Sequence, residues 1–549
     1  MCAIVGIMGE NISEDLKKML ISLKHRGPDY SGIWINNQLI MDDIVSMNPP
    51  KGYFGMGHNL LSIVGCHESQ PIVSEEMVLV CNGEIYNYPE IKKSLLNSKN
   101  QKFITDSDCE IIINLNQHYQ NELKKDLIQS NNFKSFCKKT AKSSNSNNSN
   151  YNISNNKISN KKMAENHVKE LIFIESLKKT MRMMDGDYAF ALWDGQNLAL
   201  ARDPVGVKPL YYGEIKDKIN AFASERKALW GLGIEEVHAL KPGHILFNDK
   251  LILAESLFES YDSNKNSETH NSKVETTYKS IESLQTQLKI ALENSIKKRI
   301  RGLEKIGLIF SGGVDSTIIA SFLKKEDIRT TLYTVGTKNS SDFQFAKKAA
   351  DNLDLKLKIL EVNEKTVLNS LEPVLEAIEE FNIMKIGVAM PLYLASKMAS
   401  DDKLKVVLSG QGADELFGGY HRYLMDYSKH GKNTQNILME DMKNIYHVNL
   451  QRDDAVTMAH GVELRVPFLD KEVIKTAFEI PIAYKIKSED DPLRKHILRQ
   501  VAQDIGVPEF IALRPKKAAQ YGSGIHKILI KKVLPYFDQE SFMKDLRGF

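Results

Sequence analysis

The sequence has few cysteines, no long apolar run and almost no net charge. Its five cysteines, at positions 2, 66, 81, 109 and 137, form no Cys-x-x-Cys pair. The sequence therefore predicts neither a disulfide framework nor a zinc site, and it favours a reducing compartment. No stretch reaches the ~18 apolar residues of a membrane span and no charged leader precedes an apolar run, so we expect a cytoplasmic protein without a membrane partner. The 73 basic and 70 acidic side chains almost cancel, which argues against nucleic acid as a partner.

The length of the chain allows more than one domain. At 549 residues and 42% hydrophobic side chains, two or more globular domains are expected. Residues 131–166 are dominated by Asn, Ser and Lys and predict a disordered surface insertion, with a partner-binding segment as the alternative. The polar stretch 261–277 has no periodicity and predicts a linker. We expect a first domain over residues 2–247, a linker over 248–283 and a second domain over 284–549.

The stretch 308–316, Leu-Ile-Phe-Ser-Gly-Gly-Val-Asp-Ser, predicts a strand, a glycine turn and the start of a helix. Gly312 and Gly313 would let the backbone approach a ligand closely, and the N-terminus of the helix favours an anion such as phosphate. Asp315 could then hold Mg²⁺ on phosphate oxygens. No Gly-Lys-Ser/Thr follows, so this is not a Walker A loop. An ordinary strand-to-helix turn is the alternative.

Downstream, apolar strand-like runs alternate with helical patterns, which predicts a parallel sheet with helices on both faces. Val335, at the end of the next strand, would lie at the carboxyl edge of this sheet. Residues 404–408 predict another buried strand, and the glycine- and carboxylate-rich run 409–420 follows it. Asp414 facing Asp315 would provide two carboxylates for Mg²⁺.

The beginning of the chain indicates a second chemistry. Removal of Met1 would leave Cys2 with a free α-amine that can activate its own thiol, whereas a buried cysteine in second place by chance is the alternative. Residues 78–81 predict a strand that ends at Asn82-Gly83-Glu84, where an amide and a backbone N–H could form an oxyanion hole. Residues 105–110 offer carboxylates, among them Asp108, that could bind a substrate ammonium group.

Cys2 and the segments 25–29, 82–87 and 105–110, in this order, resemble the glutaminase domain of the class II glutamine amidotransferases. The resemblance implies an αββα Ntn-type sandwich. It also implies roles for single residues: Cys2 attacks the glutamine amide, Asn82 and Gly83 stabilise the oxyanion, and Glu84 and Asp108 hold the α-amino group of glutamine.

With these motifs, the segments 308–316, 409–420, 461–470 and 495–499 look like those of the glutamine-hydrolysing asparagine synthetases. The resemblance covers almost the whole chain except the insertion and the last residues. It implies a mixed α/β and α+β fold whose second part is a doubly wound parallel-sheet ATP-pyrophosphatase domain. By this resemblance Lys495 and Gln411 are catalytic, Asp315 and Asp414 hold Mg²⁺, and ATP contacts Ile309, Ser311, Gly312, Gly313, Asp315, Ser316, Val335, Asp342, Ser409 and Gly410.

The resemblance also implies an activity. ATP and Mg²⁺ would convert the side-chain carboxylate of aspartate into β-aspartyl-AMP. Ammonia from glutamine would pass through an internal tunnel and displace AMP, giving asparagine, glutamate, AMP and pyrophosphate. Glutamine, aspartate and ATP are the expected partners, and a homodimer is one candidate assembly.

Three positions depart from the family pattern. Leu60 stands where an arginine usually pairs with the glutamine carboxylate, and Arg26 is a candidate replacement. Gln411 stands where many members have Glu, and an amide cannot accept a proton from ammonia at neutral pH. Residues 384–387 replace a Thr-Thr-x-Arg segment, with Lys385 as a candidate cation. These departures leave two alternatives, an enzyme that amidates another carboxylate and an ammonia-dependent or regulatory homologue with an impaired glutaminase.

Overall fold

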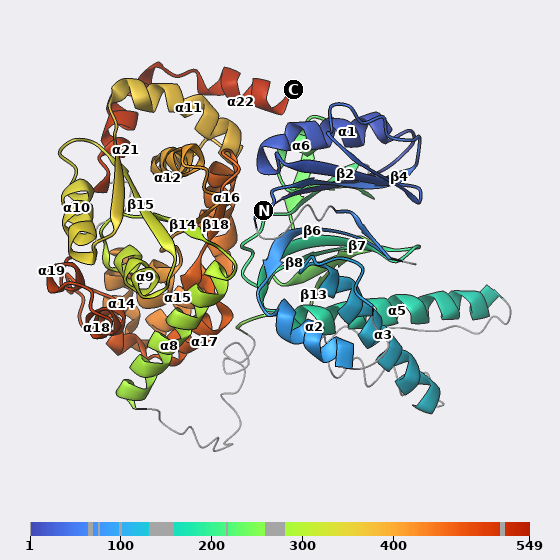
Figure 1. Ribbon diagram of the computed structural model, residues 1–549, viewed down its shortest axis with the longest axis horizontal. Coiled ribbons are helices and arrows are strands. Elements are labelled where there is room, and N and C mark those ends of the chain that lie inside the picture. Colours follow the sequence, from blue (N-terminus) through green and yellow to red (C-terminus); the bar gives the residue numbers. More distant parts are fainter. Residues whose placement is uncertain are drawn as a thin grey trace.

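A computed structural model describes residues 2–63, 70–74, 77–97, 102–130, 159–215, 218–258, 280–515 and 522–548. The chain forms two domains that lie side by side (Figure 1). Residues 131–158 of the predicted insertion and the polar stretch 261–277 lie outside the described residues. In the described part of the chain, no helix combines the length and the apolar character that a membrane crossing requires.

Two antiparallel sheets packed face to face form the centre of the N-terminal domain. One has the strand order β11-β9-β10-β1-β4-β2-β3 and the other β13-β12-β8-β7-β6-β5. Alternate side chains such as Ile4 and Phe222 of the first sheet and Val80 and Leu200 of the second meet in the core between them. The strands are β1 (Ala3–Met8), β2 (Tyr30–Ile35), β3 (Gln38–Asp42), β4 (Phe54–Leu60), β5 (Ile72–Val73), β6 (Val78–Ile85), β7 (Gly186–Trp193), β8 (Leu198–Arg202), β9 (Tyr211–Ile215), β10 (Lys218–Ala223), β11 (Glu236–Ala239), β12 (His244–Phe247) and β13 (Lys250–Leu253).

Helices cover the outer faces of both sheets (Figure 1). On the first sheet, Leu16 and Leu20 of α1 pack with Val5 and Ala223. On the second, Ile112 of α3 and helix α5 pack over β6 and β7. The helices are α1 (Ser13–Ser22) and α6 (Lys227–Trp230) on one side, and α2 (Tyr88–Asn97), α3 (Glu110–Ser130) and α5 (Ser159–Met183) on the other. This arrangement confirms the predicted αββα sandwich.

The domain limits differ from those predicted. β13 pairs with β12, so the first domain continues past residue 247. Asn248 and Asp249 between these strands have φ values of 47° and 58°, the left-handed conformation of a two-residue hairpin turn. Helix α8 begins at Ile281, where the Ser280 side chain accepts a hydrogen bond from Ser283 N. Helix α5 already begins at Ser159, inside the range 131–166 predicted as an insertion.

The C-terminal domain is built on a parallel sheet of strand order β16-β15-β14-β17-β18. The order reverses at β14, because the chain proceeds from β14 to β15 on one side and later adds β17 on the other. A crevice at the carboxyl ends of the strands is expected at such a switch point. The strands are β14 (Lys305–Ile309), β15 (Arg329–Gly336), β16 (Lys356–Glu361), β17 (Val406–Leu408) and β18 (Glu463–Arg465).

Helices lie on both faces of this sheet, α9 and α10 on one and α12 on the other (Figure 1). The predicted doubly wound domain is therefore confirmed. The helices are α8 (Ile281–Ile300), α9 (Val314–Lys325), α10 (Ser341–Leu353), α11 (Glu364–Ile378), α12 (Ile383–Asp401), α13 (Ala413–Phe417), α14 (Arg422–His430), α15 (Thr434–Ile445), α16 (Gln451–Met458), α17 (Lys471–Glu479), α18 (His496–Asp504), α19 (Glu509–Ala512), α21 (Ile525–Ile528) and α22 (Gln539–Arg547).

The two domains share apolar packing. Val205 and Val207, in the loop after β8, belong to the hydrophobic core of the C-terminal domain. Helix α22 returns to the N-terminal domain (Figure 1), where the Arg547 guanidinium lies 5.6 Å from the centre of the Trp230 ring. The domains therefore contact each other at more than one place along the chain.

Candidate functional site

The turn after β14 adopts the geometry that its glycines predict. Gly312 has φ 65°, and a Cβ atom there would lie 2.5 Å from the backbone nitrogen of Ala346, so a residue without a side chain is required. Gly313 is the N-cap of α9, which begins at Val314. The backbone N–H of Gly313 donates to Ser311 Oγ at 3.3 Å. The turn therefore presents the N-terminus of α9 at the carboxyl edge of the sheet.

A cleft opens at this edge, with about 1040 Å³ of empty space that includes its open mouth. It lies between the ends of β14 and β17, as the switch point predicts. Of the residues predicted to contact ATP, Gly312 and Gly313 do not line it, since Gly312 faces α10. The predicted residues that do line it are Ile309, Ser311, Asp315, Ser316, Val335, Asp342, Ser409 and Gly410, together with Gln411 and Asp414.

Two carboxylates in this cleft converge on one cation. Lys495 Nζ lies 2.8 Å from both oxygens of Asp315 and 2.6 Å from Asp414 Oδ1. The lysine is fully buried and precedes α18 in the left-handed conformation, with φ 54°. The predicted facing of Asp315 and Asp414 is therefore present, with the Lys495 ammonium between them. Two carboxylates at the cleft also fit Mg²⁺, which prefers such oxygen ligands.

Cys2 and Asn82 lie together in the N-terminal domain. The backbone nitrogen of Cys2 donates to Asn82 Oδ1 at 3.0 Å, and burial raises the pKa of the Cys2 thiol. Asn82 Nδ2 is buried and finds no hydrogen-bond acceptor among the described residues. Gly83 follows on β6, where a Cβ atom would lie 2.6 Å from the carbonyl oxygen of Asp187. An unpaired amide donor on the side chain that contacts the nucleophile residue is what an oxyanion hole requires.

Asp108 lies against β6 next to Glu84, because it binds the backbone of the following residue. Asp108 Oδ2 accepts a hydrogen bond from Ile85 N at 2.5 Å. Burial, and then the charge of Glu84, raise the pKa of Asp108 to about 7. A positive group between the two carboxylates would relieve this repulsion, as the predicted binding of an α-ammonium group requires. Glu84 Oε2 also accepts a hydrogen bond, at 3.0 Å, from Arg465 Nη2 of the other domain.

Comparison with known proteins identifies the family. An asparagine synthase model matches residues 287–436 and 427–541, and two glutamine amidotransferase domain models match residues 1–133 and 144–231. A Methanocaldococcus jannaschii protein named as glutamine-hydrolysing asparagine synthetase 1 is 39% identical over 98% of this chain and 96% of its own length. The chain belongs to the asparagine synthetase family.

More distant members of the asparagine synthetase family match nearly the whole chain as well. A glutamine-hydrolysing asparagine synthetase of Brassica oleracea is 28% identical over 96% of this chain and 78% of its own length.

Among solved structures, a glutamine phosphoribosylpyrophosphate amidotransferase from B. subtilis aligns with 62% of this chain and 67% of its own, at 17% identity and a TM-score of 0.33.

Arg26, the candidate replacement for the family arginine at position 60, is engaged within the protein. It is fully buried, and its Nη1 lies 2.7 Å from Glu225 and 2.8 Å from Asp454. Its Nε donates to the carbonyl oxygen of Cys2 at 3.2 Å. Two carboxylates pair with this one cation, one of them shared with Lys227, while Arg26 Nη2 is buried without a hydrogen-bond partner among the described residues, so Arg26 stays a candidate ligand of the glutamine carboxylate.

Lys385, the candidate cation in the segment that replaces Thr-Thr-x-Arg, does not line the cleft. Its Nζ pairs with Glu380 at 2.6 Å and donates to the carbonyl oxygen of His447 at 3.0 Å. Arg452 lines the cleft instead, with Asn449 beside it. Neither residue was predicted from the sequence, because Asn449 lies inside and Arg452 lies just after a π-helical turn over Tyr446–Leu450 that no 3.6-residue period predicts.

Gln411 lies in the cleft, as the family motif predicts, and its backbone N–H donates to Ser409 Oγ at 3.2 Å. One turn later, Glu415 is buried behind it. Burial, and then the charge of Asp414, raise the pKa of Glu415 to about 7. Tyr420 and Asn449, which both line the cleft, donate hydrogen bonds to Glu415 Oε1. The position that departs from the family thus adjoins a buried carboxyl group.

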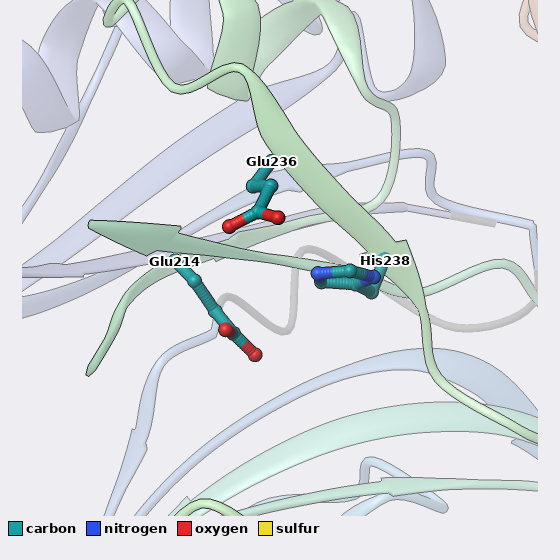
Figure 2. Close-up of side chains that lie close together, drawn as sticks. All are labelled: Glu214, Glu236 and His238. Carbon is teal, nitrogen blue, oxygen red and sulfur yellow. The ribbon is translucent and has the colours of Figure 1, made fainter. Parts of the chain in front are cut away.

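A second group of metal-ligand type lies away from both sites, on β9 and β11 of the N-terminal domain. Figure 2 shows Glu214, Glu236 and His238 on the same side of these two strands. One ligand atom from each lies within 4.8 Å of the others. Glu214 stands directly opposite Glu236 in the strand register, a pairing of like charges that is unfavourable without a cation. All three side chains are at least partly exposed.

Proposed function

We propose that the protein makes asparagine from aspartate, with ATP as the source of energy and glutamine as the source of ammonia. One observation carries this proposal: a single chain holds the Cys2–Asn82 pair in one domain and the Lys495-bridged carboxylates Asp315 and Asp414 in the cleft of the other. A glutaminase alone would not need the second site. An ATP-dependent ligase that uses free ammonia would not need the first.

In the C-terminal domain, we propose that ATP occupies the cleft at the carboxyl edge of the sheet. The N-terminus of α9 and the Lys495 ammonium would attract its phosphates. Asp315 and Asp414 would hold Mg²⁺, which neutralises phosphate charge. A carboxylate oxygen of aspartate then attacks the α-phosphorus and pyrophosphate leaves. Lys495 is placed to stabilise the charge that develops on the phosphate oxygens.

In the N-terminal domain, we propose that the Cys2 thiolate attacks the side-chain amide of glutamine. Asn82 Nδ2 and the backbone N–H of Gly83 would donate hydrogen bonds to the oxyanion, and Glu84 and Asp108 would hold the α-ammonium group. Collapse of the intermediate gives a thioester and ammonia, and water then releases glutamate. Ammonia would reach the cleft through the interior and displace AMP from the acyl group.

A second candidate function is amidation of a carboxylic acid other than aspartate. It is favoured by the position of Lys385, which pairs with Glu380 outside the cleft, and by Arg452, which lines the cleft in its place. A changed cation at the acceptor site changes which acid it prefers, because charged groups fix orientation and specificity in such pockets.

The test is to quantify asparagine, AMP and pyrophosphate from aspartate, ATP and Mg²⁺, with glutamine and with ammonium as parallel nitrogen sources. Asparagine, AMP and pyrophosphate in equal amounts from both sources would support the proposal. Pyrophosphate release with another acid but not with aspartate would replace it by the second candidate. Product from ammonium alone would show that Leu60 is not compensated.

Two further expectations belong to this proposal. A cytoplasmic location is part of the proposal, and localisation of a tagged chain would test it. A homodimer is the proposed assembly, for which light scattering of the purified protein is the direct measurement.

A further inference from the structure

Strand β18 is an edge strand of the parallel sheet and lies on the side of the C-terminal domain that faces the N-terminal domain (Figure 1). All three of its residues are buried. Glu463 and Arg465 are two positions apart and so share one face of the strand. Two fully buried charged side chains on one short strand are costly unless each finds a partner.

Each of these two side chains has a partner in the N-terminal domain, and Arg465 Nη1 also donates to the carbonyl oxygen of Arg299 in its own domain at 2.5 Å. Glu463 Oε1 lies 3.2 Å from Lys208 Nζ, and Lys208 is itself fully buried. Arg465 Nη2 donates to Glu84 Oε2 at 3.0 Å, and Arg465 Nε donates to Glu463 Oε1 at 3.3 Å. A strand of the C-terminal domain therefore places a guanidinium group on Glu84, one of the two carboxylates predicted to hold the α-amino group of glutamine.

The backbone of the same residue reaches the other site. Leu408, the last residue of β17, stands opposite Arg465 in the parallel register. The carbonyl oxygen of Arg465 accepts a hydrogen bond from Ser409 N at 3.1 Å, and Ser409 lines the cleft. Arg465 thus contacts a residue of the cleft through its backbone and a residue of the glutamine site through its side chain.

The guanidinium of Arg465 also affects the repulsion between the two carboxylates of the glutamine site. Glu84 and Asp108 repel each other, and the charge of Glu84 contributes to the raised pKa of Asp108. Arg465 pairs with Glu84 at 3.0 Å and fixes the direction of its carboxylate, since a guanidinium binds with a defined planar geometry. A displacement of β18 would therefore change both the orientation of Glu84 and the repulsion that Asp108 experiences.

We infer that Arg465 is a positioning residue for glutamine, supplied by the C-terminal domain, and that it couples occupancy of the cleft to glutamine binding. The inference rests on the proposed function. A ligand that moves Ser409 moves the β18 backbone hydrogen-bonded to it, and the side chain of Arg465 transmits this movement to Glu84. Because coupling between two binding sites is reciprocal, glutamine must alter nucleotide affinity by the same factor.

The experiment compares the wild-type enzyme with Arg465→Lys. This substitution keeps the positive charge but removes the planar guanidinium group that fixes the direction of the Glu84 carboxylate. The readouts are the KM for glutamine in glutamate release, with and without ATP, Mg²⁺ and aspartate, and the asparagine made from ammonium. We expect the ligands of the cleft to lower the wild-type KM for glutamine by roughly fivefold or more. In Arg465→Lys we expect a raised KM for glutamine that no longer responds to these ligands, whereas ammonium-dependent synthesis stays within about twofold of wild type.

The matched control is Arg226→Lys. Arg226 also crosses the domain interface to a buried glutamate, with its Nε 3.2 Å from Glu379 Oε2, but it touches neither Glu84 nor Ser409. Arg226→Lys should match the wild type in the KM for glutamine, in the response of this KM to the ligands of the cleft, and in ammonium-dependent synthesis. The inference is overturned if Arg465→Lys leaves the KM for glutamine and its response unchanged, if the wild-type KM does not respond to the cleft's ligands, or if Arg226→Lys has the same effect.

A purely structural role for Arg465 would lower glutamine- and ammonium-dependent synthesis together with the unfolding temperature, and this result would also overturn the inference. Failure of the proposed function itself has a different signature: the wild-type enzyme makes no asparagine from ammonium. In that case glutamate release still reports the KM for glutamine, so the two failures can be told apart.

Discussion

At the scale of single residues, Asn82 shows most clearly how the glutamine site could stabilise an oxyanion. Its Oδ1 accepts from the backbone nitrogen of Cys2, and its buried Nδ2 has no acceptor in the described part of the chain. A buried donor without a partner costs about 1–3 kcal/mol. An oxyanion that forms during the reaction would satisfy this donor, so the unpaired state favours the transition state over the free enzyme.

We predict that Asn82→Ala lowers kcat for glutamine-dependent synthesis by about 10²–10³-fold, the usual loss for one oxyanion-hole donor. Ammonium-dependent synthesis should remain, because that reaction takes place in the other domain. The two rates are measured on the same preparation, with ammonium as the internal control. An equal loss of both rates would contradict the assignment.

The pKa of Asp108, raised to about 7, predicts a pH dependence. The carboxyl group is neutral below this pKa and charged above it, and only the charged form attracts an α-ammonium group. The KM for glutamine should therefore fall as the pH rises from 6 towards the pKa of about 7 and level off above it. Asp108→Asn should have a high KM that varies little across this range. A wild-type KM that is flat with pH would contradict this role for Asp108.

Sequence reasoning predicted residues that act within one continuous motif. Asp315, Asp414 and Lys495 were each placed by a local pattern, and the structure brings them together. The contact of Arg465 with Glu84 joins positions 381 residues apart, and neither local pattern refers to the other. Such a contact depends on how the domains dock, which no spacing within one motif determines.

At the scale of elements, the two glycines of the turn after β14 differ in whether the backbone requires a residue without a side chain. Gly312 has a left-handed backbone and lies against the backbone of Ala346, whereas a Cβ atom on Gly313 would meet Ser311 Oγ at 3.3 Å and no closer atom. The first glycine is therefore needed for the shape of the turn. The second occupies an extended conformation, with φ −84°, that any residue can adopt.

We predict that Gly312→Ala destabilises the protein by at least about 1–2 kcal/mol from backbone strain alone, with a further penalty for the clash at α10, and abolishes ATP-dependent pyrophosphate release. Gly313→Ala is the matched control, since its stability should change by less than about 1 kcal/mol. Thermal unfolding and pyrophosphate release measure the two effects. Equal destabilisation by both substitutions would contradict this reading of the turn.

The type and order of the elements could be predicted better than their limits. Alternating apolar strands and amphipathic helices predicted the doubly wound domain, because burial on both faces leaves a strong pattern. Strand β13 was missed, since the Asn248-Asp249 turn is short and polar and resembles the start of a linker. The π-helical turn at Tyr446–Leu450 was missed because it breaks the helical period locally.

At the scale of the whole molecule, the interface between the domains is rich in charged pairs, and these differ in burial. Lys208 and Glu463 form a pair that is buried on both sides, whereas Lys405 pairs with Asp29 at 2.8 Å while its side chain stays 43% exposed. Removal of one partner of a buried pair leaves the other charge buried with less compensation, which lowers stability. The charges of an exposed pair are largely screened by water, so its loss costs little.

We predict that Lys208→Met lowers the free energy of unfolding by about 1–3 kcal/mol, since Arg465 still pairs with Glu463, and that Lys405→Met, the matched control, lowers it by no more than about 1 kcal/mol. All 3 tryptophans of the chain, Trp34, Trp193 and Trp230, lie in the N-terminal domain, so their fluorescence follows that domain. Circular dichroism follows the helices of both. Urea titrations by the two probes should coincide in the wild-type protein and separate in Lys208→Met if docking is lost; unchanged midpoints would contradict the prediction.

Strand β18 also limits how this enzyme can be recombined. Its Glu463 and Arg465 complete an environment in the other domain that includes Lys208 and Glu84. A hybrid that joins this N-terminal domain to a foreign ligase domain would leave both N-terminal residues facing a strand that did not evolve with them. Protein engineers who exchange the halves of such enzymes should therefore transfer these four residues as one unit, with the hybrid junction drawn around the contact rather than at the linker.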